Sequence, residues 1–403
     1  MKNEQNVPQV RFKGFTDAWE QREFGNVFEE YSEKNHEELP PLTIIQGKGT
    51  ILRDESDRNL IYDKAGLKNY KLVNKDDFIL HLRSFEGGLE VANSKGIVSP
   101  AYHIFHGENV DTGFYYPFFR SKFFISVLLK PHVYGIRDGK SIDVDGMKTI
   151  KIPYPKIEEQ QAIGNYFKSL DNLITLHQRK CETLQKLKKS MLQKMFPKNG
   201  SLYPEIRFAG FTDAWEQREL RSVFTIRNEK NGDRYSREDV LAVSDTYGCV
   251  NQIKFHGRSF AGEDISNYKV VRTGDIVYTK SPLQAKPYGI IKIVGEETGI
   301  ISPLYVVNET IEGIDPMFMY YLFDTPERTN NYLSPLVRKG AKNTMNISNE
   351  EWLSGIVTIS PNEEEQRAIG NYFKSLDNLI TLHQRKLETL KKMKKSMLQK
   401  MFI

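Results

Sequence analysis

One long helical segment occurs twice in this chain, and it constrains the fold more than any other feature. Residues 158–196 return as residues 364–402 at a constant offset of 206, and the two copies differ at only four of 39 positions. Neither copy contains proline, and each has a single glycine near its start. At about 1.5 Å per residue such a helix would be roughly 55 Å long, far beyond the few turns usual in globular domains. The repeat therefore predicts a duplicated protein built around two long helices.

Apolar residues in both copies recur at alternating steps of four and three, which is the heptad pattern of paired helices. The polar residues His177 and Lys188 interrupt this pattern in the first copy. Because a lone helix of this length leaves its apolar stripe uncovered, we expect the two copies to pair with each other. The predicted pairing seam consists of Ile163, Phe167, Leu170, Ile174 and Leu184 in the first copy and Ile369, Phe373, Leu376, Ile380 and Leu390 in the second.

A second repeat precedes each half of the chain. Residues 7–28 recur as residues 203–224, with the shared core Arg-Phe-x-Gly-Phe-Thr-Asp-Ala-Trp-Glu-Gln-Arg-Glu. We call this core, residues 11–23 and 207–219, the aromatic box. Its glycine, its phenylalanines and the tryptophans Trp19 and Trp215 predict a docking segment that packs against something common to both halves. A ligand site is the less favoured interpretation.

The segments between box and helix, residues 29–157 and 225–363, have diverged and differ in length by ten residues. Both contain short β-rich runs bounded by turn residues (77–82 and 275–279), then aromatic-rich stretches that we expect to be helical (114–129 and 316–333). Each half closes with a short strand ending in proline, residues 150–155 and 356–361. The predicted fold is α+β, a tandem duplication with two α/β domains. The predicted divisions are 1–157 (first domain), 158–196 (first helix), 197–363 (second domain) and 364–403 (second helix).

Composition places the chain among globular proteins, with 39% apolar and 27% charged residues. No apolar run approaches the roughly 20 residues of a membrane span, and the polar start lacks a signal-peptide core, so we expect a cytoplasmic protein without a membrane partner. Cys181 is leucine in the other helix copy, which favours an apolar role for it. Of the net charge of +5, the helices carry +8 and the remainder −3. Binding of nucleic acid would therefore depend on local basic clusters.

Motifs of enzymes are missing from the sequence. The segment Gly135-Ile-Arg-Asp-Gly139-Lys140-Ser141 has three residues between its glycines where a phosphate-binding loop has four. His36-Glu37 lacks a second histidine at the metalloprotease spacing, and His103 and His106 have no histidine counterparts in the second half. We identify no nuclease motif and no cofactor-binding loop of a methyltransferase. The sequence thus predicts neither a catalytic centre nor a metal site in this chain.

Polar residues on predicted loops fit DNA recognition better, because Arg and Lys pair with guanine edges while Asn and Gln pair with adenine edges. Solvated surface charges are the alternative for each residue taken alone. Both halves also place Arg-x-Gly followed by Lys before the closing strand, at Arg137 and Arg338, where the glycine suits a tight turn. The candidate DNA-binding residues are Gln46, Lys48, Arg83, Arg137, Lys140, Lys254, Arg258, Lys280, Lys286, Arg338, Lys342 and Asn343.

Taken together, the whole chain resembles the specificity subunits of bacterial type I restriction-modification systems. The resemblance rests on the two variable domains, the near-identical helices introduced by Pro-x-x-Glu-Glu-Gln or Pro-Asn-Glu-Glu-Glu-Gln, the Ala-Ile-Gly-x-Tyr-Phe run and the Phe-Thr-Asp-Ala-Trp-Glu box. It implies that each variable domain is a target recognition domain that reads one half of a bipartite double-stranded DNA site. It also implies that the helices pair antiparallel around a pseudo-twofold axis, set the spacing and dock the modification subunits.

The resemblance further implies a complex with two modification subunits, which bind S-adenosylmethionine and methylate adenine, and with restriction subunits that use ATP and Mg²⁺. No cofactor is expected in this chain, which would be non-catalytic by itself. No motif marks individual DNA-contacting residues, so none is transferred from the family. The alternative function is a coiled-coil scaffold whose two domains bind proteins.

Overall fold

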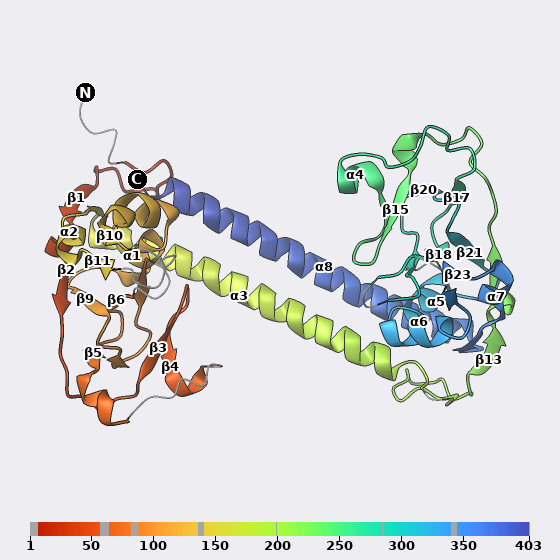
Figure 1. Ribbon diagram of the computed structural model, residues 1–403, viewed down its shortest axis with the longest axis horizontal. Coiled ribbons are helices and arrows are strands. Elements are labelled where there is room, and N and C mark those ends of the chain that lie inside the picture. Colours follow the sequence, from red (N-terminus) through yellow and green to blue (C-terminus); the bar gives the residue numbers. More distant parts are fainter. Residues whose placement is uncertain are drawn as a thin grey trace. The chain divides into compact units, whose positions relative to one another are not determined.

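The computed structural model describes residues 7–56, 64–81, 88–135, 141–198, 200–283, 286–339 and 345–402. The chain forms two compact units (Figure 1). Unit 1 consists of Met1–Gln178 and Arg385–Ile403, and unit 2 consists of Arg179–Gln384. Each unit therefore contains one α/β domain, the first part of its own long helix and the last part of the other. The four-part linear division of the chain stays a prediction, since these units divide both helices.

The two long helices are α3, Ile157–Lys194, and α8, Glu363–Lys400. Each begins with glutamates in its first turn, where the positive end of the helix dipole favours them. In unit 1, Phe167 and Asp171 of α3 contact Phe402 and Lys394 respectively, so the two helices run antiparallel. Unit 2 repeats the arrangement, because Lys188 of α3 lies 2.8 Å from Asp377 of α8. The predicted α+β fold with antiparallel helices is confirmed.

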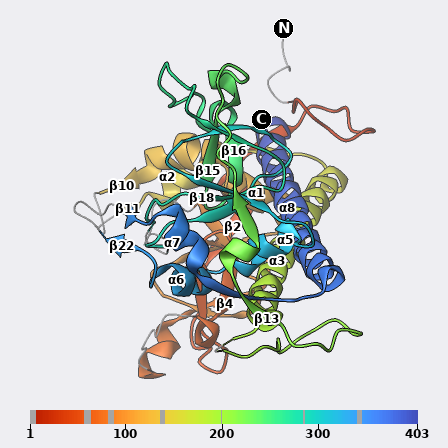
Figure 2. The same ribbon diagram turned by 90° about the vertical axis from the view of Figure 1, so that its right-hand side faces the viewer.

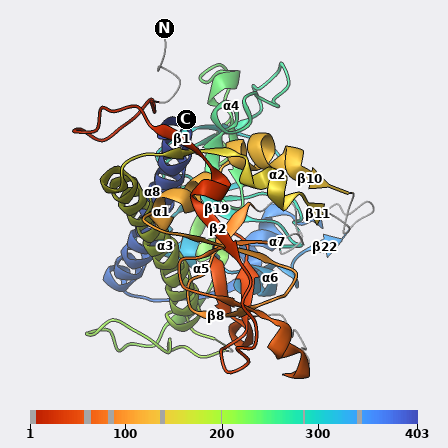
Figure 3. The same ribbon diagram turned by 90° about the vertical axis from the view of Figure 1, so that its left-hand side faces the viewer.

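Unit 1 contains a four-stranded antiparallel sheet in the order β2-β9-β6-β7. Figure 3 turns this unit toward the viewer, with β2 labelled. Smaller antiparallel pairs are β1-β12, β3-β4, β5-β8 and β10-β11. The strands are β1 Glu20–Glu23, β2 Phe28–Tyr31, β3 Leu42–Ile45, β4 Gly49–Leu52, β5 Lys71–Val73, β6 Phe78–Leu80, β7 Leu89–Val91, β8 Gly96–Val98, β9 His103–Gly107, β10 Val133–Tyr134, β11 Ser141–Ile142 and β12 Lys151–Tyr154. The helices besides α3 are α1 Thr112–Phe119 and α2 Val144–Lys148.

Unit 2 repeats these pairings with the sheet β14-β21-β18-β19 and the pairs β13-β24, β15-β16, β17-β20 and β22-β23 (Figure 2). Its strands are β13 Glu216–Glu219, β14 Phe224–Ile226, β15 Leu241–Ser244, β16 Gly248–Asn251, β17 Lys269–Val271, β18 Ile276–Tyr278, β19 Ile291–Ile293, β20 Gly299–Ile301, β21 Val306–Thr310, β22 Arg338–Lys339, β23 Met345–Asn346 and β24 Ile356–Ile359. Its helices besides α8 are α4 Gln252–His256, α5 Pro316–Leu322, α6 Pro326–Leu333 and α7 Asn349–Ser354.

The predicted β-rich runs and closing strands are confirmed, but the predicted helical stretches are broken. In unit 1 the stretch 114–129 contains α1 and then a separate π-helical segment, Phe124–Leu129. In unit 2 the stretch 316–333 divides into α5 and α6 at Thr325, whose hydroxyl accepts a hydrogen bond from the Arg328 amide. Thr325 precedes Pro326, and a residue before proline avoids the helical conformation. Proline at the first helical position therefore starts a new helix there.

An aromatic core holds the sheet of unit 1 to α1 and the helix ends. Phe28 of β2 lies 5.4 Å from Phe78 and 5.0 Å from Tyr115, measured between ring centroids. Phe402, just after α8, is buried in the same cluster and stacks on Phe167. Phe196, just after α3, occupies the equivalent place in unit 2, where it stacks on Phe373. Each domain core is thus completed by the end of the long helix that begins in the other half of the chain.

The seam residues lie mostly within these cores. Ile163, Phe167 and Leu170 are buried in the cluster of unit 1, and Leu390 packs against that cluster. Ile369, Phe373 and Leu376 are buried in the cluster of unit 2, where Leu184 packs against them. Ile380 is buried and Ile174 is partly buried. The ends of the helices are therefore covered by domain residues as well as by each other.

The aromatic box is bound to the first turn of the long helix in each unit. The Arg11 guanidinium donates to both carboxylate oxygens of Glu159 at 2.6 and 2.7 Å, and the Trp19 indole donates to the same carboxylate at 3.0 Å. Arg207 and Trp215 bind Glu365 in the same way, at 2.6, 2.8 and 3.1 Å. The docking interpretation of the box is therefore confirmed. Each box contacts the equivalent glutamate in the first turn of its own long helix.

We expect Glu365→Ala to destabilise unit 2 by about 3–5 kcal/mol, because it leaves a partly buried arginine without its carboxylate. Glu365 is fully buried, and it also accepts a hydrogen bond from the Ser360 hydroxyl. The matched control is the exposed neighbour Glu364→Ala, expected to change the free energy of unfolding by no more than about 0.5 kcal/mol. Denaturant unfolding of the full chain checks both variants, and equal losses of stability would contradict this role of Glu365.

Candidate nucleic-acid interface

Two equivalent hairpins present exposed side chains, and the hairpin of unit 1 carries two of the candidate residues. In unit 1, β3 and β4 are joined by the turn Gln46-Gly47-Lys48, and the side chains of Gln46 and Lys48 are exposed. In unit 2, β15 and β16 are joined by Asp245-Thr246-Tyr247, with Tyr247 65% exposed. The frames of the two hairpins agree in length and register, while the residues at their tips differ. This is the arrangement expected of two readers with different targets.

Basic and aromatic side chains follow the hairpin of unit 2. Lys254 lies on α4, is exposed and pairs with Glu297 at 2.5 Å. Arg258 is exposed, and its guanidinium lies 4.9 Å from the ring centroid of Phe260. Both candidates are therefore exposed, and α4, which contacts β16, lies next to β15 in Figure 1.

Exposed rings near this hairpin were not predicted. Tyr247 lies 5.2 Å from Phe255, and His256 lies 4.5 Å from Phe255 and 5.1 Å from Phe260. Phe255 and Phe260 are 41% and 57% exposed, which is unusual for phenylalanine. Aromatic rings beside basic side chains can stack on nucleobases. The signal that could have indicated these rings is the group of aromatic residues around Lys254 and Arg258, namely Phe255, His256 and Phe260.

Two candidate lysines of unit 2 point into the protein. The Lys280 ammonium donates to the Ile347 carbonyl at 2.8 Å, and burial lowers the pKa of Lys280. Lys286 is 7% exposed, and its ammonium donates to the Asp245 carboxylate at 2.6 Å. Both ammonium groups are therefore held by protein partners, Lys280 by a backbone carbonyl and Lys286 by a carboxylate of the hairpin turn, and we leave both out of the proposed DNA contacts.

Arg338 lies on β22 and is 83% exposed by its side chain, with Glu351 at 3.1 Å. The strands β22 and β23 pair antiparallel, as β10 and β11 do in unit 1. The candidates Arg83, Arg137, Lys140, Lys342 and Asn343 lie outside the described residues. The Arg-x-Gly turns of both units therefore remain predictions, bounded on each side by a described strand.

Within the described ranges, no three His, Cys, Asp or Glu side chains are grouped as ligands for a metal ion. None of the helices described is both long enough and apolar enough to cross a membrane. The Cys249 thiol is partly buried, and this burial raises its pKa to about 12, so it is a poor nucleophile.

Comparisons with known proteins relate the whole chain to one family. The protein-family model described as "Type I restriction modification DNA specificity domain" matches residues 17–186 of this chain. The type I restriction enzyme MjaVIII specificity subunit of Methanocaldococcus jannaschii is 25% identical over 350 residues, covering 81% of this chain and 78% of that protein. The putative type I restriction enzyme MjaX specificity subunit of the same organism is 23% identical over 431 residues, covering 98% and 95%.

A solved structure shares the fold. The type I restriction-modification S subunit from M. genitalium covers 98% of this chain and 99% of its own, with a TM-score of 0.60 at 13% identity. The repeated boxes, the antiparallel helices and the curated relatives lead to the same assignment. The chain carries a type I restriction-modification DNA specificity domain in its first half and is similar over most of its length to specificity subunits of type I restriction enzymes.

Proposed function

We propose that each unit of this subunit reads one half of a bipartite double-stranded DNA site. The observation that carries the proposal is the duplicated frame with different tips. Both units hold the box to the helix through equivalent glutamates, Glu159 and Glu365. One hairpin nevertheless presents Gln46 and Lys48, while the other presents Tyr247. A conserved frame with divergent exposed side chains fits two independent readers of different sequences.

The proposed contacts in unit 1 are Gln46, which suits an adenine edge, and Lys48, which suits guanine or phosphate. In unit 2 we propose Arg258 and Lys254 for guanine or phosphate, with the exposed rings of Tyr247 and Phe260 stacking on bases. These groups are exposed, so DNA could reach them without rearrangement of the core. The regions outside the helices are not basic overall, and binding is therefore expected to require such local groups.

We propose that the long helices set the gap between the half-sites and dock two modification subunits. Large apolar side chains remain exposed on both helices, and exposed apolar patches of this kind mark sites of protein–protein interaction. The most exposed of them are Leu173 and Leu176 on α3 and Leu379 and Leu382 on α8, at 43–46% exposure. S-adenosylmethionine, ATP and Mg²⁺ would be bound by the modification and restriction subunits, and the complex would act in the cytoplasm.

Selection from a random duplex library tests this function. The chain is reconstituted with its modification subunits, and the retained duplexes are sequenced. We expect two short specific sequences separated by a gap of constant length, and no methylation or cleavage by the partner-free chain. Retention without any common sequence would contradict DNA recognition and leave a protein-binding scaffold as the alternative.

We expect Arg338→Ala to weaken binding at one half-site only, if its exposed guanidinium reads a base edge. The cost should be about 1–3 kcal/mol, with relaxed preference at a single position. Arg338→Lys is the matched control: it keeps the charge but loses the paired donors, so only phosphate contact would survive it. Affinities for half-site variants at several salt concentrations check this. Wild-type affinity of Arg338→Ala would show that Arg338 makes no DNA contact.

A further inference from the structure

A chain of charged side chains lies beneath the hairpin of unit 2. Asp245, the first residue of the hairpin turn, accepts a hydrogen bond from the Lys286 ammonium at 2.6 Å, and its carboxylate lies 3.4 Å from the Lys292 ammonium. Lys292 is the middle residue of edge strand β19 and is 5% exposed. Its ammonium also lies 3.9 Å from the Asp324 carboxylate, just after α5. The tip of the hairpin is thus connected to the interior of the unit through charge.

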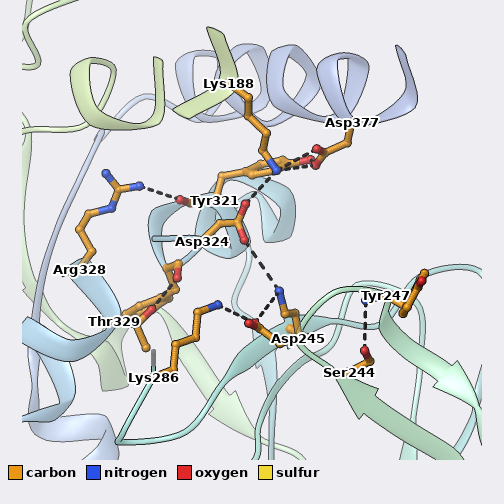
Figure 4. Close-up of polar contacts among 12 residues, drawn as sticks. Lys188, Ser244, Asp245, Tyr247, Lys286, Tyr321, Asp324, Arg328, Thr329 and Asp377 are labelled. Carbon is orange, nitrogen blue, oxygen red and sulfur yellow. Dashed lines mark hydrogen bonds and ion pairs between the residues drawn. The ribbon is translucent and has the colours of Figure 1, made fainter. Parts of the chain in front are cut away.

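The same chain continues to both long helices, as Figure 4 shows. The Lys188 ammonium of α3 donates to Asp324 at 2.9 Å and to Asp377 of α8 at 2.9 Å. The Tyr321 hydroxyl donates to Asp377 at 2.8 Å. Burial alone would lower the pKa of Lys188, but the carboxylates of Asp324 and Asp377 outweigh burial and raise it. Lys188, which interrupts the heptad pattern, therefore stays charged because its ammonium group pairs with two aspartates.

Unit 1 has a charged pair of opposite sign at the equivalent positions. Glu90 is the middle residue of edge strand β7, as Lys292 is of β19. Arg120 follows α1 at the same distance from the helix N-cap as Asp324 follows α5. The Arg120 guanidinium lies 2.5 Å from the fully buried Glu90 carboxylate. In unit 1 the acidic residue lies on the edge strand and the basic residue follows the helix. In unit 2 the basic residue lies on the edge strand and the acidic residue follows the helix.

The hairpin of each unit is bonded to its own version of this pair. In unit 1, Glu90 accepts hydrogen bonds from the backbone amides of Gly47 and Gly49, at 2.8 and 3.2 Å. In unit 2, the strand residue is a lysine, and the hairpin supplies a carboxylate, Asp245, in return. Unit 1 has Gln46, which carries no charge, at the hairpin position equivalent to Asp245. Each hairpin is therefore complementary to the buried charge that it contacts. The hairpin of unit 1 offers amide donors to a carboxylate, and the hairpin of unit 2 offers a carboxylate to an ammonium group.

We propose that the strand and helix residues Glu90 and Arg120 in unit 1, and Lys292 and Asp324 in unit 2, are positioning residues that orient the recognition hairpin. Hairpin and pair then form one specificity module, so a hairpin carried alone into the other unit would meet the wrong charge. This inference rests on the proposed function of the hairpins as DNA readers. Its physical basis is that a buried charge needs a specific partner, which makes these contacts directional where apolar packing is not.

A hairpin graft into unit 1 tests the proposal in the full chain. Residues 42–52 are replaced by the sequence of residues 241–251, which has the same length, with and without E90K and R120D. The graft alone brings the aspartate that corresponds to Asp245 beside the buried Glu90, and two neighbouring carboxylates repel each other. With both substitutions, the new lysine meets that carboxylate and the new aspartate meets Lys394, the repeat counterpart of Lys188.

Amide hydrogen exchange of the hairpin without DNA is the first readout. We expect the graft alone to exchange at least tenfold faster than the wild-type hairpin, and the graft with E90K and R120D to return to within about threefold. Equal protection of the two grafts, whether high or low, would overturn the proposal. Binding to the selected duplex is the second readout, and only its failure in the wild type would overturn DNA recognition itself.

A single variant keeps the proposal testable if the graft does not fold. Asp245→Asn should speed amide exchange of the unit 2 hairpin at least tenfold and weaken reading of one half-site. Glu216→Gln, which removes the charge of the exposed Arg218–Glu216 pair on β13 of the same unit, is the matched control and should change exchange of the hairpin by less than twofold. Unchanged protection in Asp245→Asn would overturn the positioning role.

Discussion

Replacing residues 29–157 with the corresponding segment of a specificity subunit of different target should change one half of the recognised sequence and leave the other half unchanged. The segment contains the sheet and the hairpin of unit 1, together with Glu90 and Arg120, so the proposed module is carried whole. Residues that complete the core from outside the segment, among them Trp19, Phe28 and Phe402, are retained. The frame therefore remains while the reader changes.

Methylation mapping in cells with the complete system checks this exchange. The reverse exchange, of residues 225–363, is the internal control and should change the other half-site. Alteration of both halves by either exchange would show that the units do not read independently.

Inserting four residues into both long helices should lengthen the gap between the half-sites by one or two base pairs. Four helical residues add about 6 Å, and one base pair of DNA occupies about 3.4 Å. The insertion points are after Gln178 and after Gln384, which are repeat counterparts at the division between the units. Insertion in both helices preserves their opposite positions, whereas insertion in one would displace the seam of one helix against the other.

The gap length is read from the methylated sequence. Replacing four exposed residues at the same places by alanine, without lengthening, is the control and should leave the gap as it is. An unchanged gap after the double insertion, with methylation retained, would contradict the role of the helices as spacers.

The repeats carried most of the predictable structure. A near-identical helix and box could be recognised without any alignment, and they predicted two domains, two long helices and a docking role for the box. The partner of the box was not predictable, because Arg11 and Glu159 lie 148 residues apart and only the fold brings them together. Local periodicity reports which face of a helix is apolar, but it cannot report which distant side chain meets a charge on it.

The candidate site was less predictable for the same reason. Lys48 and Lys286 look alike in sequence, yet one stands exposed on a hairpin turn and the other is buried against Asp245. A long side chain can extend into solvent or reach an interior carboxylate, and its neighbours in the fold decide which. The exchange of sign between Glu90 and Lys292 also becomes visible only after the two sheets are placed in the same register.

Methylation sequencing of cells that carry the complete system, with and without the gene for this chain, tests the central claim most directly. The account predicts adenine methylation at a single bipartite sequence, with two specific halves and a gap of constant length, and its complete loss when this chain is absent. Methylation that persists without the chain, or that falls on one continuous sequence, would contradict the assignment of sequence recognition to these two units.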